Sequence, residues 1–382
     1  MTSIPPLPDG FDALKEFPIL SRWDFFNHGG VAPISARAAT ALEKYTREAA
    51  GDAYLTGNWY AQADKTRALA AKIINAHPDE IAFVKNTSEG IAFVANGLDW
   101  HAGDEILSTS VEYPANVYPW MDLAQRFGVK HVMVPERDGR IDQEEFLAAV
   151  TPKTRMIALS HVEFASGFRN DLVEIGKFCR EREILFCVDA IQSIGVVPVD
   201  VQAMNIDFLS ADGHKWMLGP EGLGFFYCRR SHLTRLRPEI GWWNVVNAQE
   251  YGTYDFTLRK DAQRFECGTY NIPGILALGA SLQLLLEVGI ENVSARVLGL
   301  TGRLCEGLAD KNYKIVSSRR KGEDSGIVSF LSDSMDQKKV VRDLHSKKIV
   351  IVMREGRMRA SPHFYNSIEQ IDRLIEALPL NK

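Results

Sequence analysis

The chain has 382 residues, and its 46% hydrophobic and 24% charged residues lie close to the averages for soluble globular proteins. This composition excludes a disordered or collagen-like chain, and the length allows a large core without disulfides. The formal charge of −5, from 44 basic and 49 acidic residues, provides no positive field for nucleic acid or an anionic membrane surface. We therefore expect no nucleic-acid partner and no membrane partner.

The N-terminal residues lack the basic start and apolar run of a signal peptide, and no apolar run has the length of a membrane span. The five cysteines are spaced too irregularly for paired metal ligands or a disulfide framework. These features predict a cytoplasmic protein with reduced thiols and no metal site.

Short apolar or β-branched runs alternate with helical stretches through the first two thirds of the chain. The predicted strands are residues 81–84, 105–109, 130–134, 155–160, 185–189, 207–210 and 223–228. Residues 61–76 and 171–183 have helical periodicity. The alternation predicts an α/β fold with a mainly parallel seven-stranded sheet and helices on both faces.

The pattern changes after about residue 270. Helical stretches are predicted at 274–288, 291–309 and 367–378, and strands at 326–331 and 349–353. We expect three parts: an N-terminal segment (1–27) that packs with a small domain, a large domain (28–270), and a small C-terminal α+β domain (271–382).

Polar residues follow the first predicted strand in the sequence Lys85-Asn86-Thr87-Ser88-Glu89-Gly90, which leads into a helical run. A helix start of this kind binds phosphate through its unpaired amides and the positive end of its dipole. The alternative is that Thr87 or Ser88 only caps the helix.

Two later strand ends also carry ionisable residues. Asp189 ends the predicted strand 185–189 and precedes Gln192, and a buried carboxylate at this position needs a cation or strong donors. Lys215 follows His214 after the next strand. Taken alone, Asp189 is equally consistent with a helix cap and Lys215 with a solvated loop residue.

A phosphate site, a buried acid and a lysine on successive strand ends match the needs of pyridoxal 5′-phosphate. With these motifs the chain resembles the class V aminotransferase family of fold type I pyridoxal-phosphate enzymes. The nearest branch is the isopenicillin N epimerase-like one, related to but distinct from the cysteine desulfurases. The motifs are KNTSEGIAFVANGL, VDAIQSIG, DGHKWMLGPEGLG, NHGG, EYPANVYPW, FECGT and RASPHFYN.

The resemblance implies a role for each matching residue. Lys215 is the expected Schiff-base lysine and the base that moves the Cα proton. Asp189 is the expected partner of the pyridine nitrogen, and Gln192 the donor to the ring's phenolic oxygen. Further cofactor contacts are expected from Thr87, Ser88, Tyr113, Asp212 and His214.

The resemblance has further implications at three positions. Tyr113 is expected to stack on the ring, and Phe164 replaces an asparagine that assists the phenolic oxygen in relatives. Thr269 matches a residue that reaches the phosphate of the neighbouring subunit. The resemblance therefore implies a homodimer with shared active sites.

The substrate is expected to be a small amino acid. Arg359 matches the arginine that clamps its α-carboxylate, and Asn27 and His28 lie in a segment that closes over substrate in relatives. We read Arg354 and Arg357 as solvated charges on an edge strand. His363 is expected to be a core histidine.

Several reactions are compatible with these residues. We expect transamination, because it requires only groups already assigned. Racemisation or epimerisation requires a second acid–base group, such as Tyr113 or His28, and Cβ–S elimination requires only a suitable leaving group. Persulfide-forming desulfuration is not expected, because residues 349–359 contain no cysteine. A non-catalytic binding module is the least expected reading.

Overall fold

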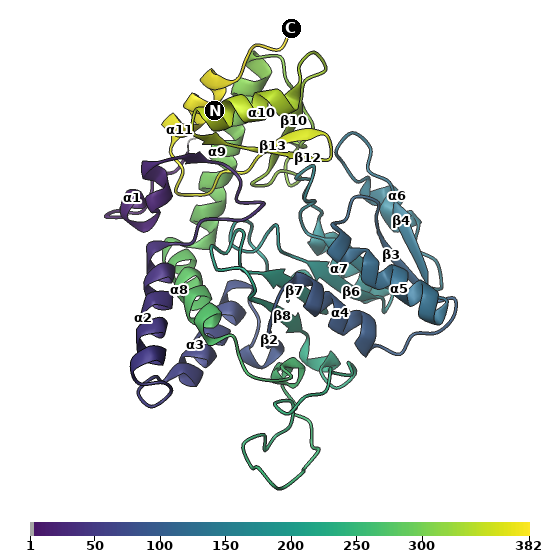
Figure 1. The fold of residues 1–382 in the computed structure, drawn as a ribbon. Helices are drawn as coiled ribbons and strands as arrows, with labels where there is room; N and C mark the ends of the chain where they lie inside the picture. Colours follow the sequence, from purple (N-terminus) through teal and green to yellow (C-terminus); the bar gives the residue numbers. More distant parts are fainter. Residues whose placement is uncertain (1–3) are drawn as a thin grey trace.

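The computed structural model describes residues 4–382 and is built around a central seven-stranded sheet (Figure 1). The order across this sheet is β2-β8-β7-β6-β5-β3-β4, and every neighbouring pair is parallel except the two that involve β8. The strands are β2 (Ile81–Val84), β3 (Glu105–Thr109), β4 (Lys130–Val134), β5 (Thr154–Ser160), β6 (Leu185–Asp189), β7 (Phe208–Asp212) and β8 (Gly224–Cys228). The predicted mainly parallel α/β architecture is confirmed.

Helices cover both faces of the sheet because its central strands are apolar on both faces. In β6, Phe186 and Val188 belong to one buried cluster while Leu185 and Cys187 belong to another, as the alternation of a strand requires. The helices are α2 (Ala36–Gly51), α3 (Trp59–Ile73), α4 (Thr87–Gly97), α5 (Tyr118–Phe127), α6 (Gln143–Ala148), α7 (Leu172–Glu181) and α8 (Ile272–Val288).

A second, smaller sheet has the order β12-β13-β10-β9 and is antiparallel. Its strands are β9 (Lys314–Ile315), β10 (Val328–Leu331), β12 (Val352–Arg354) and β13 (Arg357–Ala360). The helices α9 (Ile290–Asp310), α10 (Gln337–Ser346) and α11 (Ile368–Ala377) surround it, and a third apolar cluster lies among them. Figure 1 shows this part above the large sheet.

The N-terminal segment joins the two parts. After α1 (Ala13–Glu16), strand β1 (Asp24–Phe25) pairs in parallel with β11 (Ile349–Val350), and Phe26 lies in the third apolar cluster. By contrast, α8 packs against α2 and α3 and contributes to the core under the large sheet. We therefore propose that the division between the two parts falls after α8.

Several elements were not predicted from the sequence, among them α2, α5, α10 and β13. In α2 only Ala38 is fully buried, and the other residues of the helix are half-buried or exposed. Strand β13 has four residues, of which two are arginines, so it lacks the apolar run that predicts a strand.

Among residues 4–382, no single helix has the length and apolar character of a membrane span. The pair α8 and α9 meets that criterion only in combination, and it is bent by 80°.

Candidate active site

A cavity of about 670 Å³ lies at the carboxyl ends of the central strands, where ligands bind in open α/β sheets. The N-terminal segment and the β12–β13 hairpin also contribute to its walls. The cavity brings together most of the residues that the sequence pointed to. These are Asn27, Thr87, Ser88, Tyr113, Asp189, Gln192, Asp212, His214, Lys215 and Arg359.

The start of α4 forms one wall of the cavity. Asn86 is its N-cap and accepts a hydrogen bond from the Glu89 amide at 3.0 Å, so the alternative that Thr87 or Ser88 is merely the cap is wrong. The Thr87 hydroxyl accepts a hydrogen bond from the Asp212 amide at 3.0 Å, which ties α4 to β7. A Cβ at Gly90 would lie 2.3 Å from Oγ of Ser210, so only glycine permits this approach.

Asp189 lies at the end of β6 and is 2% exposed. Its Oδ1 accepts a hydrogen bond from the Ile191 amide at 3.0 Å, whereas Oδ2 is buried with no partner. Burial raises the pKa of this carboxyl to about 6, against the opposing effects of the Ile191 amide and Lys215. The cavity therefore contains a buried carboxylate oxygen that still needs a donor or a cation.

Lys215 follows β7, and its side chain has no hydrogen bond or ion pair among residues 4–382. Nζ lies 5.5 Å from the ring centroid of Tyr113. The pKa of the lysine is lowered to about 8, mainly by burial and in part by Arg359, against the opposing effect of Asp189. A larger fraction of the amine is therefore neutral near pH 7 than in an exposed lysine, as a nucleophilic or proton-accepting lysine requires.

Gln192 connects the lysine segment to the N-terminal segment. Its Nε2 donates to the Gly29 carbonyl at 3.0 Å, and its Oε1 accepts from Nε1 of Trp216 at 2.9 Å. One hydrogen of Nε2 remains for a ligand. A Cβ at Gly29 would lie 3.2 Å from Oε1 of Gln192, so this close approach also favours glycine.

Arg359 projects from β13 and is 1% exposed. Its guanidinium donates to the Phe164 carbonyl at 2.7 Å and to Oδ1 of Asn27 at 3.3 Å, and Nε has no partner. Its pKa is lowered to about 9, mainly by burial and in part by Arg354, which leaves it cationic at neutral pH. Within residues 4–382 no carboxylate is paired with it, so this buried cation suits an anionic ligand.

The structure corrects the reading of His28, which does not line the cavity. Its ring is fully buried and contacts the Ser361 carbonyl at 2.8 Å and the Tyr365 hydroxyl at 2.5 Å. The pairing of Asn27 with Ser361 turns the two side chains in different directions, so only Asn27 faces the cavity. His363 is a core histidine as predicted, and it contacts the Trp216 carbonyl at 3.0 Å.

Arg354 and Arg357 have different surroundings. Arg354 is an exposed charge on the edge strand β12, as predicted, and it also lines the cavity together with Glu355. Arg357 instead pairs with Glu136 at 2.8 Å. The signal in the sequence was the Glu-Gly pair flanked by two arginines, which is compatible with a two-residue hairpin turn.

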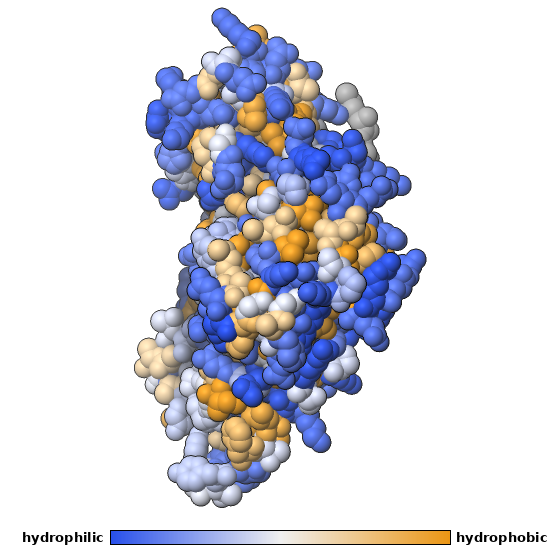
Figure 2. Space-filling model, turned by 90° about the vertical axis from the view of Figure 1, so that its right-hand side faces the viewer, coloured by the Kyte–Doolittle hydropathy of each residue, from blue (hydrophilic) through white to orange (hydrophobic). Residues whose placement is uncertain are grey.

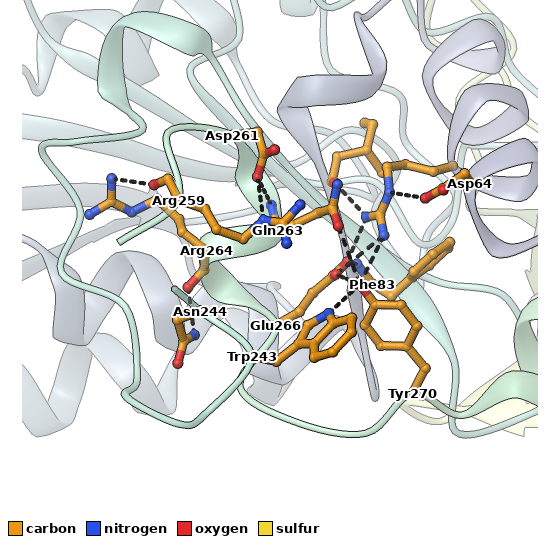
Figure 3. A network of polar contacts seen from close by, with 12 residues as sticks. Asp64, Phe83, Trp243, Asn244, Arg259, Asp261, Gln263, Arg264, Glu266 and Tyr270 are labelled. Carbon is orange, nitrogen blue, oxygen red and sulfur yellow. Dashed lines mark hydrogen bonds and ion pairs between the residues drawn. The ribbon is translucent and has the colours of Figure 1, made fainter. Parts of the chain in front are cut away.

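Thr269 lies outside this cavity, on an exposed segment that borders a separate pocket. A buried network fixes the residues on either side of it (Figure 3). Glu266 pairs with Arg67 at 2.5 Å and accepts from the Tyr270 hydroxyl at 2.5 Å, and Trp243 donates to the same hydroxyl at 2.8 Å. The network therefore presents Thr269 outward on a rigid support.

Comparison with known proteins identifies the family. The aminotransferase class-V family matches residues 26–374. A probable cysteine desulfurase of Methanothermobacter thermautotrophicus is 31% identical, with 96% of each chain covered. The chain belongs to the class V aminotransferase family.

Solved structures of similar fold extend this assignment. An apo cysteine desulfurase from Thermococcus onnurineus has a TM-score of 0.89 at 26% identity, with 98% of each chain covered. A cystine C–S lyase in complex with its product cysteine persulfide has a TM-score of 0.87 at 27% identity, covering 94% of this chain and 98% of that one. The class V enzyme described here is pyridoxal-phosphate-dependent and has the fold type I architecture.

The residues of the cavity fit this cofactor. The unpartnered Oδ2 of Asp189 suits a protonated pyridine nitrogen, and the α4 start suits a phosphate. Lys215 offers a buried amine without a partner, and Nδ1 of His214 lies 2.9 Å from Oδ1 of Asp212 beside it.

Proposed function

We propose that this class V enzyme is a Cβ–S lyase, which removes sulfur from a cysteine-type amino acid by elimination. The observation that carries the proposal is that no cysteine lines the cavity. Four of the five cysteines are buried elsewhere, and the exposed one, Cys267, borders a different pocket. Relatives named for cleavage of sulfur bonds support sulfur chemistry, and elimination is the form of it that needs no protein thiol.

The roles proposed for the cavity residues follow from their contacts. When bound, pyridoxal phosphate supplies the electron sink that makes the Cα proton of an amino acid acidic. Asp189 would hold the proton on the pyridine nitrogen, and Gln192 would donate to the phenolic oxygen with its remaining hydrogen. Tyr113, whose ring contacts Phe164 edge to face at a centroid distance of 5.2 Å, would stack on the cofactor.

Lys215 and Arg359 act on the substrate. The planar guanidinium of Arg359 grips the α-carboxylate, and this grip places Cα near the amine of Lys215. The amine takes the Cα proton, and the Cβ–S bond breaks with its electron pair on sulfur. Water converts the resulting 2-aminoacrylate to pyruvate and ammonium. The sequence is redox-neutral and needs no co-reactant besides water.

The structure also bears on racemisation. That reaction needs a second acid–base group on the opposite face of the ring, and His28 is fully occupied by Ser361 and Tyr365 in the core. Tyr113 alone remains for that role. Transamination, the reaction expected from the sequence, stays a prediction that the same experiment tests.

We also propose that the enzyme acts as a homodimer with shared sites. Thr269 is exposed and outside its own subunit's cavity. The loop at the lower end of Figure 1 exposes Trp242, Tyr251, Tyr254 and Phe256, and hydrophobic side chains also reach the surface toward this end in Figure 2. Exposed apolar patches of this kind mark interaction surfaces.

The test is to incubate the enzyme, loaded with pyridoxal phosphate, with L-cysteine and L-cystine and to quantify the products. Elimination gives pyruvate and ammonium in equal amounts, and this yield persists in Cys267→Ala but disappears in Lys215→Ala. Alanine with a protein persulfide that Cys267→Ala abolishes would establish desulfuration. Amino-group transfer to added keto acids without sulfur release would establish transamination.

A further inference from the structure

The tip of the β12–β13 hairpin places two unpaired charges at the cavity. Arg354 pairs across the hairpin with Arg357, and the turn between them is Glu355-Gly356. Both turn residues have positive φ, 45° and 72°. Asn, Asp or Gly is the usual residue at such a position, so a glutamate there is an outlier that the surrounding structure must maintain.

The charges of the cavity can be sorted by their partners. Asp212 pairs with His214, Asp189 lies opposite Lys215, and Arg359 is the deep cation assigned to the α-carboxylate. Arg354 and Glu355 line the same cavity, but among residues 4–382 neither has an ion-pair partner within 4.0 Å. The Arg354 guanidinium donates only to the Met353 carbonyl, at 2.9 Å.

Arg357 holds the hairpin in place. It pairs at 2.8 Å with Glu136, whose side chain is 7% exposed. This contact anchors one strand of the hairpin to the segment that follows β4, while Arg354 and Glu355 at the tip line the cavity. The positive charge of Arg354 also lowers the pKa of both Lys215 and Arg359, so it acts on the interior of the cavity.

We propose that Arg354 and Glu355 recognise the distal amino-acid end of a substrate in which two amino acids are joined through sulfur, as in cystine. The proposal rests on the lyase function above and defines its substrate class. Arg354 binds the distal carboxylate and Glu355 the distal ammonium, while Arg359 holds the carboxylate of the reacting half.

A disulfide-linked pair places its two Cα atoms roughly 4.4–6.8 Å apart, so the distal charges lie at a separate position from the reacting half. The exposed Arg354 and Glu355 line the same cavity as the buried Arg359. A cavity of about 670 Å³ has the size of pockets that enclose a cofactor-sized ligand. Elimination from cystine breaks the Cβ–S bond and leaves cysteine persulfide, which takes up one proton; no oxidant or reductant is required.

The binding test uses an analogue that cannot eliminate, so it does not depend on turnover. The holoenzyme is titrated with 2,7-diaminosuberate, in which carbon replaces both sulfurs of cystine, and with 2-aminooctanoate, which has the same chain without the distal groups. The change in cofactor absorbance gives the dissociation constants. We expect diaminosuberate to bind about tenfold more tightly, and Arg354→Ala to remove most of that difference.

A second comparison separates the two charges. Four disulfides share the reacting cysteine: cystine and the mixed disulfides with 3-mercaptopropionate, cysteamine and ethanethiol. Pyruvate release should show the highest kcat/KM for cystine and the lowest for the ethanethiol compound. Arg354→Ala should lower kcat/KM more for the 3-mercaptopropionate compound, and Glu355→Gln should lower it more for the cysteamine compound. Both losses should arise mainly from a higher KM. Arg342→Ala, an exposed arginine on α10 outside the cavity, is the matched control.

Each outcome separates the two proposals. Equal affinity for the two analogues, or equal losses in Arg354→Ala and Arg342→Ala, would overturn the distal site even if pyruvate forms. Preferential binding of diaminosuberate without pyruvate from any disulfide would refute the lyase function and leave the distal site standing.

Discussion

Oδ2 of Asp189 and Nε of Arg359 are among the buried atoms of the cavity that have no hydrogen-bond partner within residues 4–382. An unsatisfied buried polar atom costs roughly 1–3 kcal/mol, and more where the group is charged. Cofactor and substrate remove these costs when they bind, so the same atoms that destabilise the empty cavity select its ligands. The residues that bind the ligands are therefore the same residues that act in the reaction.

Replacement of Asp189 by Asn tests this argument. The amide keeps the size of the carboxyl group but cannot hold a protonated pyridine nitrogen, so the electron sink is weakened in a water-poor site. We expect kcat to fall about a hundredfold or more, while the affinity for pyridoxal phosphate changes less. Steady-state rates and cofactor titration measure the two effects. Asp333→Asn, an exposed position, serves as the control, and unchanged turnover in Asp189→Asn would assign ring protonation to another group.

The gathering of the candidate residues in one cavity was the part of the site best predicted from the sequence. Asp189, Gln192 and Lys215 follow directly on buried strands, so a parallel sheet necessarily brings them to one edge. His28 was misread because its orientation depends on contacts more than three hundred residues away, and the place of Arg354 at the cavity was missed because it depends on a turn. The bridge from Asn27 to Ser361 and the positive φ of Glu355 are not visible as patterns in the sequence.

At the scale of elements, strands β3 and β5 are joined beneath the cavity by a pair of buried glutamates. Glu112 accepts hydrogen bonds from the Ser160 amide at 2.9 Å and the Ser160 hydroxyl at 2.6 Å. Glu163 accepts from Asn170 at 3.0 Å, and the Thr109 hydroxyl lies within 3.4 Å of both carboxyls. No cation is paired with either glutamate among the described residues.

Burial raises the pKa of both glutamates above their usual range; the charge of Glu112 raises the pKa of Glu163 further, and the charge of Asp189 adds to the shift of Glu112. A carboxyl whose folded-state pKa lies above its unfolded value stabilises the fold most below the unfolded value, and that contribution is lost as pH rises through the folded pKa. We therefore expect the free energy of unfolding to decline from pH 5 to pH 8 through this pair.

Glu163→Gln should reduce that decline, because the amide keeps an acceptor for Asn170 and carries no charge. At pH 8 the variant should be more stable than the parent by about 1–2 kcal/mol, and the two should be similar at pH 5. Urea denaturation at both pH values measures this. Glu306→Gln, at an exposed position on α9, should show no such pH-dependent gain. A Glu163→Gln variant that is less stable than the parent at pH 8 would contradict the raised pKa of Glu163 as the cause of the decline.

For the whole molecule, the seven-stranded sheet and its mainly parallel order could be predicted because buried parallel strands are continuous apolar runs. The division into two parts was less accessible, because α8 is apolar on nearly every face and packs with α2 and α3 rather than with the small sheet. The proposed homodimer is a further level of organisation, and a single sequence indicates it only indirectly.

The proposed dimer predicts the effect of the Thr269→Ala substitution on cofactor retention. If Thr269 reaches the phosphate site of a neighbouring subunit, Thr269→Ala removes a contact that exists only in the assembly. Cofactor retention should then weaken several-fold, whereas kcat at saturating pyridoxal phosphate should change little. In the parent enzyme, retention should fall as protein is diluted below the dimer dissociation constant. Light scattering with cofactor absorbance across a dilution series measures both, with Ser346→Ala on α10 as the control. A fully active monomer that keeps its cofactor on dilution would refute the shared site.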